Sequence, residues 1–298
     1  MPLSPERREE IVSAMINTIG EHNNNAALAP SELAKRFGVS GQSIARIIKK
    51  LEESGRVLTV AEGKKKSFSL PTVTKTLEYK TEGLDEESVF ASDVKAFISG
   101  VPECPYKNFS YAFLEMLNNA IEHSNGSKIY IYLIKNEYRL AFLLMDDGIG
   151  IFKKISDALG LREKRHALLE LSKGKFTTDP GSHSGEGIFF SSKCGDLFTL
   201  MSDGISFLSA PDYNMLIDDV VTPLMRKKFR TGTEIFFEIK MSHTQTLAEL
   251  FQEYTDAPES YGFTKTKIPI RLLEYGDSMP LFLSRSEAVQ RMITHVTR

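Results

Sequence analysis

The middle of the chain carries the segment Phe113-Leu-Glu-Met-Leu-Asn-Asn-Ala-Ile-Glu-His-Ser124. Its apolar residues recur at helical spacing, so Glu115 and Asn119, four positions apart, are predicted to lie on one face of a helix. A carboxylate and an amide oxygen one turn apart can orient a water molecule and hold a hydrated magnesium ion. The segment therefore predicts a helix that presents both groups to a polar ligand.

Two glycine-containing segments follow this helix. The first, Asp146-Asp-Gly-Ile-Gly150, comes directly after the apolar run 140–145, so an aspartate is expected where a buried strand ends in a glycine turn. An acceptor at this place can meet an exocyclic amine. The second, Gly181-Ser-His-Ser-Gly185-Glu-Gly187, precedes a helix expected from about Ile188, whose N-terminal amides suit an anion. The order and spacing of the three segments predict an ATP pocket.

The three segments resemble the nucleotide-binding motifs of the GHKL ATPases, the superfamily of gyrase, heat-shock chaperone, histidine kinase and MutL nucleotide-binding domains. The similarity covers about half of the chain and is nearest to the anti-sigma-factor kinases. It implies ATP and Mg²⁺ as cofactors. It also implies a central α/β sandwich, in which a mixed sheet carries helices on one face.

The resemblance implies a role for each motif residue. Glu115 would be the catalytic base that activates water or a hydroxyl, and Asn119 would be the Mg²⁺ ligand. Asp146 would accept a hydrogen bond from the adenine amino group. Gly148 and Gly150 would let the backbone approach the base. Gly185 and Gly187 would shape the phosphate end of a lid. The later segment Arg230-Thr-Gly-Thr233 would place Thr233 near adenine through a water.

Residues 152–187 are predicted to form a lid over the triphosphate, because the sequence there becomes charged and then polar. A short helix is expected within it, near Arg162–Ser172. Lys173 and Lys175 are candidates for phosphate contacts. The alternative is a surface helix followed by a loop.

The first 75 residues carry twelve Lys or Arg and eight Asp or Glu, a net charge of +4, whereas the whole chain has a net charge of -2. Pro30–Phe37, the turn Gly38–Ser40 and a helix from Gly41 to about Ser54 predict two helices joined by a tight turn. A hairpin is expected over 56–70. Residues 1–75 therefore resemble a winged helix-turn-helix DNA-binding domain.

The second of these helices is expected to be the recognition helix. Its apolar stripe leaves four residues outward to meet base edges and phosphates: Gln42, Ser43, Arg46 and Lys50. Three residues at the hairpin tip are expected to contact the phosphate backbone: Lys64, Lys65 and Lys66. A winged helix used for protein contacts or dimerisation is the alternative.

The remaining segments are less regular. Residues 71–87 are polar and without a sustained period, so they are predicted to be a linker into an ATPase domain that covers 76–242. Residues 243–298 begin with an expected helix at Leu247–Tyr254 and then resemble the opening of a STAS-like domain, which we expect to be truncated. A C-terminal extension packed on the ATPase domain is the alternative.

Several protein classes are not expected. No histidine ahead of the ATP motifs suits a phosphoacceptor helix, and histidine kinases usually carry asparagine at the place of Glu115, so this chain is not predicted to be a histidine kinase. Cys104 and Cys194 have no metal-ligand spacing and are expected to be reduced thiols. The longest apolar runs have the length of strands, which predicts no membrane span and a cytoplasmic protein.

Three functions fit these motifs. The first is an ATP-binding and DNA-binding regulator, in which Mg-ATP binding with slow hydrolysis switches conformation. The second is a serine or threonine kinase of the anti-sigma-factor type, acting on a STAS-like domain with Glu115 as the base. The third binds nucleotide without turnover. The expected partners are ATP, DNA through the winged helix, a protein through the STAS-like segment, and a second copy of the chain.

Overall fold

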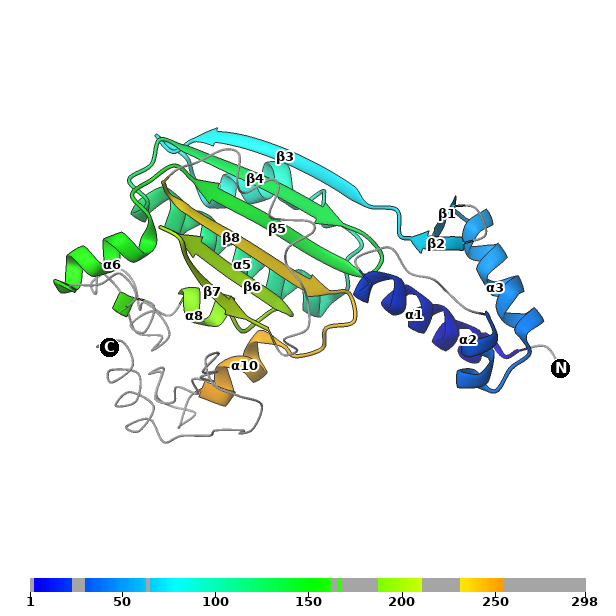
Figure 1. Ribbon diagram of the computed structural model, residues 1–298. Coiled ribbons are helices and arrows are strands. Elements are labelled where there is room, and N and C mark those ends of the chain that lie inside the picture. Colours follow the sequence, from blue (N-terminus) through cyan, green and yellow to red (C-terminus); the bar gives the residue numbers. More distant parts are fainter. Residues whose placement is uncertain are drawn as a thin grey trace.

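The structure is a computed structural model that describes residues 3–22, 30–62, 65–161, 166–167, 187–210 and 231–254. It contains a small, mainly helical N-terminal unit and a larger domain, here called the sheet domain, in which helices cover one face of a six-stranded sheet (Figure 1). The predicted α/β class, with an N-terminal helical unit and helices layered on a sheet, is confirmed.

The N-terminal unit consists of three helices and a hairpin. Its elements are α1 (Pro5–Glu21), α2 (Pro30–Phe37), α3 (Gly41–Glu53), β1 (Leu58–Glu62) and β2 (Lys65–Ser69). Ser4 and Ser40 cap α1 and α3, because each side-chain oxygen accepts a hydrogen bond from a backbone N–H of the first turn. The apolar stripes of the three helices form one buried core. The sequence predicted α2, α3 and the stripe of α3, whereas α1 was not predicted.

The sheet domain contains six strands in the order β3-β4-β5-β8-β6-β7. Their bounds are β3 (Val73–Lys80), β4 (Lys128–Lys135), β5 (Arg139–Asp146), β6 (Leu197–Ser202), β7 (Ile205–Ser209) and β8 (Thr233–Lys240). Every pair of neighbouring strands is antiparallel. The prediction of a mixed sheet is therefore wrong. Two pairs, β4–β5 and β6–β7, are joined by turns too short for the crossover that parallel strands need.

The prediction of a linker over residues 71–87 is wrong, because β3 lies there and pairs with β4 along its whole length. The predicted domain boundary at residue 75 falls inside this strand. β3 is an edge strand, and only alternate residues are partly buried, among them Leu77 and Tyr79. Lys75 and Tyr79 both donate to Asp93, at 2.8 Å and 2.9 Å, which fastens the strand to the helical layer.

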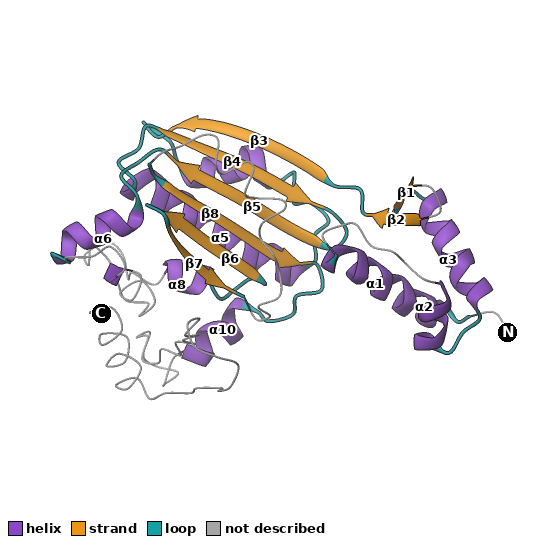
Figure 2. Cartoon of the chain, viewed as in Figure 1, coloured by secondary structure: helices purple, strands orange, loops and turns teal. Residues whose placement is uncertain are grey.

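The helices of the sheet domain are α4 (Glu86–Val89), the π-helical turn η1 (Phe90–Val94), α5 (Glu103–His123), α6 (Ile151–Leu159), α8 (Gly187–Ser191) and α10 (Leu247–Tyr254). The long helix α5 lies along one face of the sheet, whereas α6 extends beyond the ends of the strands (Figure 2). Phe109 of α5 meets Phe142 of β5 edge to face, with ring centroids 5.4 Å apart. Phe142 in turn stacks on Phe237 of β8 at 5.4 Å, so aromatic rings join the helical layer to the two central strands.

The helix predicted over Leu247–Tyr254 is confirmed as α10. It packs on the sheet domain, since Phe251 meets Phe190 of α8 edge to face at 4.5 Å and Leu250 is 2% exposed. For these eight residues the structure therefore matches the alternative of a packed C-terminal extension. Residues 255–298, on which the STAS-like expectation depends, lie outside the described residues. No described helix combines the length and hydrophobicity that a membrane crossing needs.

Candidate nucleotide site and nucleic-acid interface

Counted along the chain, the three motifs are the helical segment 113–124, the segment 146–150 and the segment 181–187. The first and the third meet in space. Glu115 and Asn119 lie one turn apart on α5, and both are half-buried. A Cβ atom built on Gly187 would overlap the carboxylate of Glu115, so this carboxylate lies directly against the backbone at the start of α8. The helix predicted from about Ile188 is confirmed as α8. The structure thus brings the proposed base to the last residue of the glycine segment, where the predicted lid ends.

The second motif begins at the end of β5, where Asp146 is only 4% exposed. Its Oδ1 accepts hydrogen bonds from the backbone N–H of Gly148 at 2.9 Å and of Thr233 at 3.2 Å. Burial raises the pKa of Asp146 to about 6, although these hydrogen bonds oppose the shift. A buried carboxylate is therefore held in a fixed orientation by two backbone donors from different strand ends.

Thr233 begins β8, and its hydroxyl accepts a hydrogen bond from the backbone N–H of Ile151 at 3.1 Å. The residue before it, Gly232, has φ 110°, and a Cβ atom there would overlap the carbonyl of Asp146. Glycine is therefore required at this place. The Gly-Thr segment and the end of β5 are thus packed backbone to backbone, and the structure places Thr233 beside Asp146.

The glycine turn of the second motif is fastened to the end of α5. The N–H of Ile149 donates to the carbonyl of Ser124 at 2.9 Å, and a Cβ atom on Gly148 would overlap that carbonyl. Gly150 immediately precedes α6, beside the side chain of Ser202. The turn therefore joins the helix of the first motif to the strand of the second.

Two side chains near this turn were not predicted from the sequence. Lys154 of α6 donates from Nζ to the carbonyl of His123 at 2.9 Å, and burial lowers its pKa. Asp147 accepts from the backbone N–H of Ser127 at 2.6 Å and of Lys128 at 2.9 Å. The position of Lys154, one turn into α6, could have suggested it as a residue near the site. The contacts of Asp147 could not be predicted, because they depend on how the strands pair.

Several predicted site residues fall outside the described residues, so the structure does not place them. They are Gly185, Lys173, Lys175, Arg230 and Lys64. Of the helix expected near Arg162–Ser172, only residues 166–167 are described, and these two are helical. The side chain of Lys65 is also outside the description.

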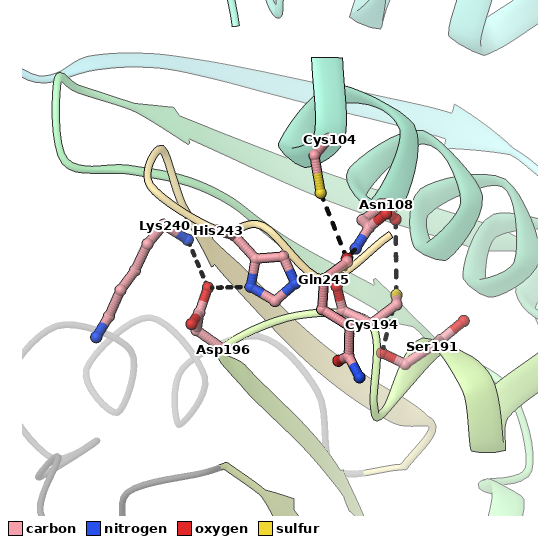
Figure 3. Close-up of polar contacts among 8 residues, drawn as sticks. All are labelled: Cys104, Asn108, Ser191, Cys194, Asp196, Lys240, His243 and Gln245. Atoms are coloured by element: carbon pink, nitrogen blue, oxygen red, sulfur yellow. Dashed lines mark hydrogen bonds and ion pairs between the residues drawn. The ribbon is translucent and has the colours of Figure 1, made fainter. Parts of the chain in front are cut away.

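The opposite end of β8 holds a polar cluster that fastens α10 to the sheet domain (Figure 3). Asn108 of α5 donates to the carbonyls of Cys194 at 2.8 Å and of Gln245 at 2.9 Å. Asp196 accepts from the backbone N–H of Lys240 at 2.8 Å and meets Nδ1 of His243 at 3.1 Å. The hydrogen bonds of this cluster end on backbone carbonyls or join Asp196 to His243. The cluster therefore holds the segment between β8 and α10 in place.

Three of the four residues predicted to contact DNA from α3 face solvent. Gln42, Arg46 and Lys50 of α3 are exposed, and so is Lys66 at the start of the second hairpin strand. Ser43 differs, because it is half-buried and its hydroxyl lies 2.9 Å from that of Ser40 at the helix cap. Three of the four predicted residues, an amide and two cations, are thus exposed on α3, and Ser43 is turned toward the cap.

Comparison with known families identifies the N-terminal unit. Residues 16–57 match the model of a winged helix-turn-helix DNA-binding family. The N-terminal unit is a winged helix-turn-helix domain. The match begins within α1, includes α2 and α3, and ends just before the first hairpin strand. No curated protein matches the chain. A winged helix-turn-helix DNA-binding domain joined to an α/β domain indicates a regulatory protein.

Proposed function

We propose that the chain is a DNA-binding regulator whose sheet domain binds Mg-ATP and, by slow hydrolysis, switches between two conformations. The observation that carries this proposal is the setting of Asp146. Its Oδ1 is held by two backbone N–H groups, and an ionised carboxylate can accept from further donors. The amino group of adenine is such a donor.

The carboxylate of Asp146 is expected to favour adenine over guanine. Guanine presents a carbonyl oxygen at the position where adenine carries its amino group, so a carboxylate there would meet an acceptor. A site built to receive a hydrogen-bond donor rejects an analogue that lacks it, because the buried polar group is then left unpaired.

The phosphate end of the proposed site is formed by the first and third motifs. Glu115 lies against Gly187, and Asn119 follows one turn later on the same helix. In the proposal Asn119 contributes an oxygen ligand to Mg²⁺, which binds oxygen donors and retains several waters. Glu115 orients the attacking water. In the proposal Gly148 and Gly150 let the backbone approach the base, and Gly185 shapes the phosphate end of the lid.

The first test is a calorimetric titration with Mg-ATP and with Mg-GTP at pH 8, where Asp146 is ionised. We expect Mg-ATP to bind at least about tenfold more tightly than Mg-GTP, since one unpaired buried acceptor costs about 1–3 kcal/mol. ADP is the companion ligand, because it retains adenine and lacks only the γ-phosphate. Equal affinity for ATP and GTP would contradict the role of Asp146, and absence of heat with both nucleotides would contradict nucleotide binding.

The second test concerns DNA. Replacing Arg46 and Lys50 together by alanine is expected to weaken binding to a random-sequence duplex, because both cations are exposed on α3. For each residue that contacts a phosphate, the slope of log affinity against log salt should fall by about 1. Fluorescence anisotropy across a salt series measures both quantities.

The matched control for this double variant is Lys95→Ala, which removes an exposed cation from the sheet domain. It should leave DNA affinity within about twofold, as expected for a charge distant from the interface. If the control and the double variant weaken binding equally, α3 is not the DNA-contacting element.

A further inference from the structure

The turn between β4 and β5 docks into the winged helix-turn-helix domain. Tyr138, the last residue of this turn, is 2% exposed and belongs to the hydrophobic core of the N-terminal domain. Its ring lies against Gly20 near the end of α1, where a Cβ atom would overlap three ring carbons. A side chain of the sheet domain therefore completes the core of the DNA-binding domain. We call this turn, Asn136-Glu137-Tyr138, the Tyr138 latch.

Polar contacts surround the buried ring. Arg56, between α3 and β1, donates from Nε to both carboxylate oxygens of Glu137 at 2.9 Å and 3.1 Å, and its Nη2 contacts the same carboxylate. Asn136 accepts from the N–H of Tyr138 and of Arg139, both at 2.9 Å, which shapes the turn. The Arg56–Glu137 pair is more than a third exposed, so it contributes less to docking than the buried ring.

The latch is continuous with the proposed nucleotide site. Tyr138 immediately precedes β5, and Asp146 is the last residue of that strand. The neighbouring strand β8 begins at Thr233, beside Asp146, and is followed by Met241, whose N–H donates to the carbonyl of Tyr138 at 2.8 Å. The two central strands of the sheet therefore run from one site to the other (Figure 1). At the rise of a β-strand they span about 25 Å.

We propose that the Tyr138 latch couples nucleotide occupancy to DNA affinity. Closure of the sheet domain on Mg-ATP displaces the ends of β5 and β8 and thereby changes the equilibrium between docked and undocked DNA-binding domains. The inference rests on the proposed function, since it needs a nucleotide that binds the two states unequally. By linkage, DNA must change the affinity for Mg-ATP by the same factor.

The hydroxyl of Tyr138 provides a matched control. It is buried, and among the described residues it has no hydrogen-bond partner. Tyr138→Phe therefore keeps the docked ring and removes only a group without a partner, whereas Tyr138→Ala removes the ring. Any difference between these two variants reports on docking by the ring.

The experiment measures DNA affinity by anisotropy with and without Mg-ATP, in the wild type, Tyr138→Phe and Tyr138→Ala. We expect Mg-ATP to change the wild-type affinity at least about fivefold, the lower end of ordinary allosteric coupling. Tyr138→Phe should keep this factor. In Tyr138→Ala the factor should fall to about 1, while Mg-ATP affinity by calorimetry stays within about threefold of wild type. An unchanged factor in Tyr138→Ala overturns the proposal.

A second variant and a second measurement guard against misfolding of Tyr138→Ala. Gly20→Leu displaces the ring from the side of α1 and leaves the sheet domain unaltered, so it should also abolish coupling and retain Mg-ATP binding. In the unaltered protein, Mg-ATP should change hydrogen exchange in residues 15–21 and 136–139. If exchange there is unchanged although Mg-ATP binds, the latch is not the coupling element. If Mg-ATP produces no heat at all, the proposed function itself fails, which is a distinct result.

Discussion

Replacing Asp146 by asparagine is expected to weaken Mg-ATP binding about 10- to 100-fold at pH 8 and to leave the fold intact. A hydrogen bond from a neutral donor to an ionised acceptor contributes about 1.5–3 kcal/mol, and tenfold in affinity corresponds to about 1.4 kcal/mol. The amide oxygen of asparagine can still accept from Gly148 and Thr233. Its NH₂ group, however, would face the adenine amine with a donor. Calorimetry measures the affinity, and thermal unfolding checks the fold.

The pH dependence of this prediction has a definite sign. The pKa of Asp146 is raised by burial to about 6, above the ordinary value of 3.8. Binding needs the ionised form, so the affinity of the wild type for Mg-ATP should rise with pH through about 6. The contribution of Asp146 to stability runs the other way. It is present below about pH 4 and is lost as pH rises through about 6, because ionising the buried carboxyl costs free energy.

These opposite signs separate lost binding from lost folding. In the wild type, acidification from pH 8 to pH 5 should reduce Mg-ATP affinity although the contribution of Asp146 to the unfolding free energy increases. In Asp146→Asn the affinity should be low at both pH values. Its melting temperature at pH 8 should equal or exceed that of the wild type. A variant that binds Mg-ATP like the wild type would show that this carboxylate does not read the base.

The neighbouring residue supplies the control. Asp147→Asn removes the same charge one position later, but Asp147 accepts from Ser127 and Lys128 at the start of β4. We expect this variant to retain Mg-ATP affinity within about threefold and to lose stability, at about 1 kcal/mol per weakened hydrogen bond. If both aspartate variants lose binding equally, a general loss of negative charge explains the effect.

The parts of the fold that were predicted correctly are those specified by neighbouring residues. The helices around Ser40 follow from a capping side chain and an apolar period, and their match to residues 16–57 confirms the DNA-binding domain. The helix at Leu247–Tyr254 was also predicted from the sequence. Local patterns also predicted that Glu115 and Asn119 share one face of a helix.

The parts that were missed depend on contacts between distant segments. β3 has alternate exposed polar residues, so its sequence lacks the apolar run of a central strand, and only pairing with β4 defines it. The turn residues Asn136 and Glu137 before Tyr138 are polar, so nothing local predicts that the Tyr138 ring is buried. Its burial requires Gly20, more than a hundred positions earlier in the chain. The antiparallel pairing of β5 with β8 is likewise set by tertiary structure, since nearly ninety residues separate the two strands.

Replacing Glu115 by glutamine is expected to reduce turnover of ATP about 10²- to 10⁴-fold, the usual contribution of a general base. Glutamine retains the shape of the side chain beside Gly187, so Mg-ATP affinity should stay within about threefold. The measurement is single-turnover conversion of γ-labelled ATP, with free phosphate and labelled protein separated. The control, Glu103→Gln, removes an exposed carboxylate at the other end of α5 and should leave turnover unchanged.

The fate of the label distinguishes the proposed hydrolase from the kinase that the resemblance also implies. Free phosphate from the wild type, lost in Glu115→Gln, would support activation of water by this carboxylate. Label on serine or threonine would instead mean that Glu115 deprotonates a protein hydroxyl, because the same base serves either acceptor. Equal turnover in the wild type and Glu115→Gln would show that the carboxylate is not the base. If the wild type binds Mg-ATP and forms neither product, ATP acts only as a conformational ligand, and coupling through Tyr138 then remains the measurable consequence of its binding.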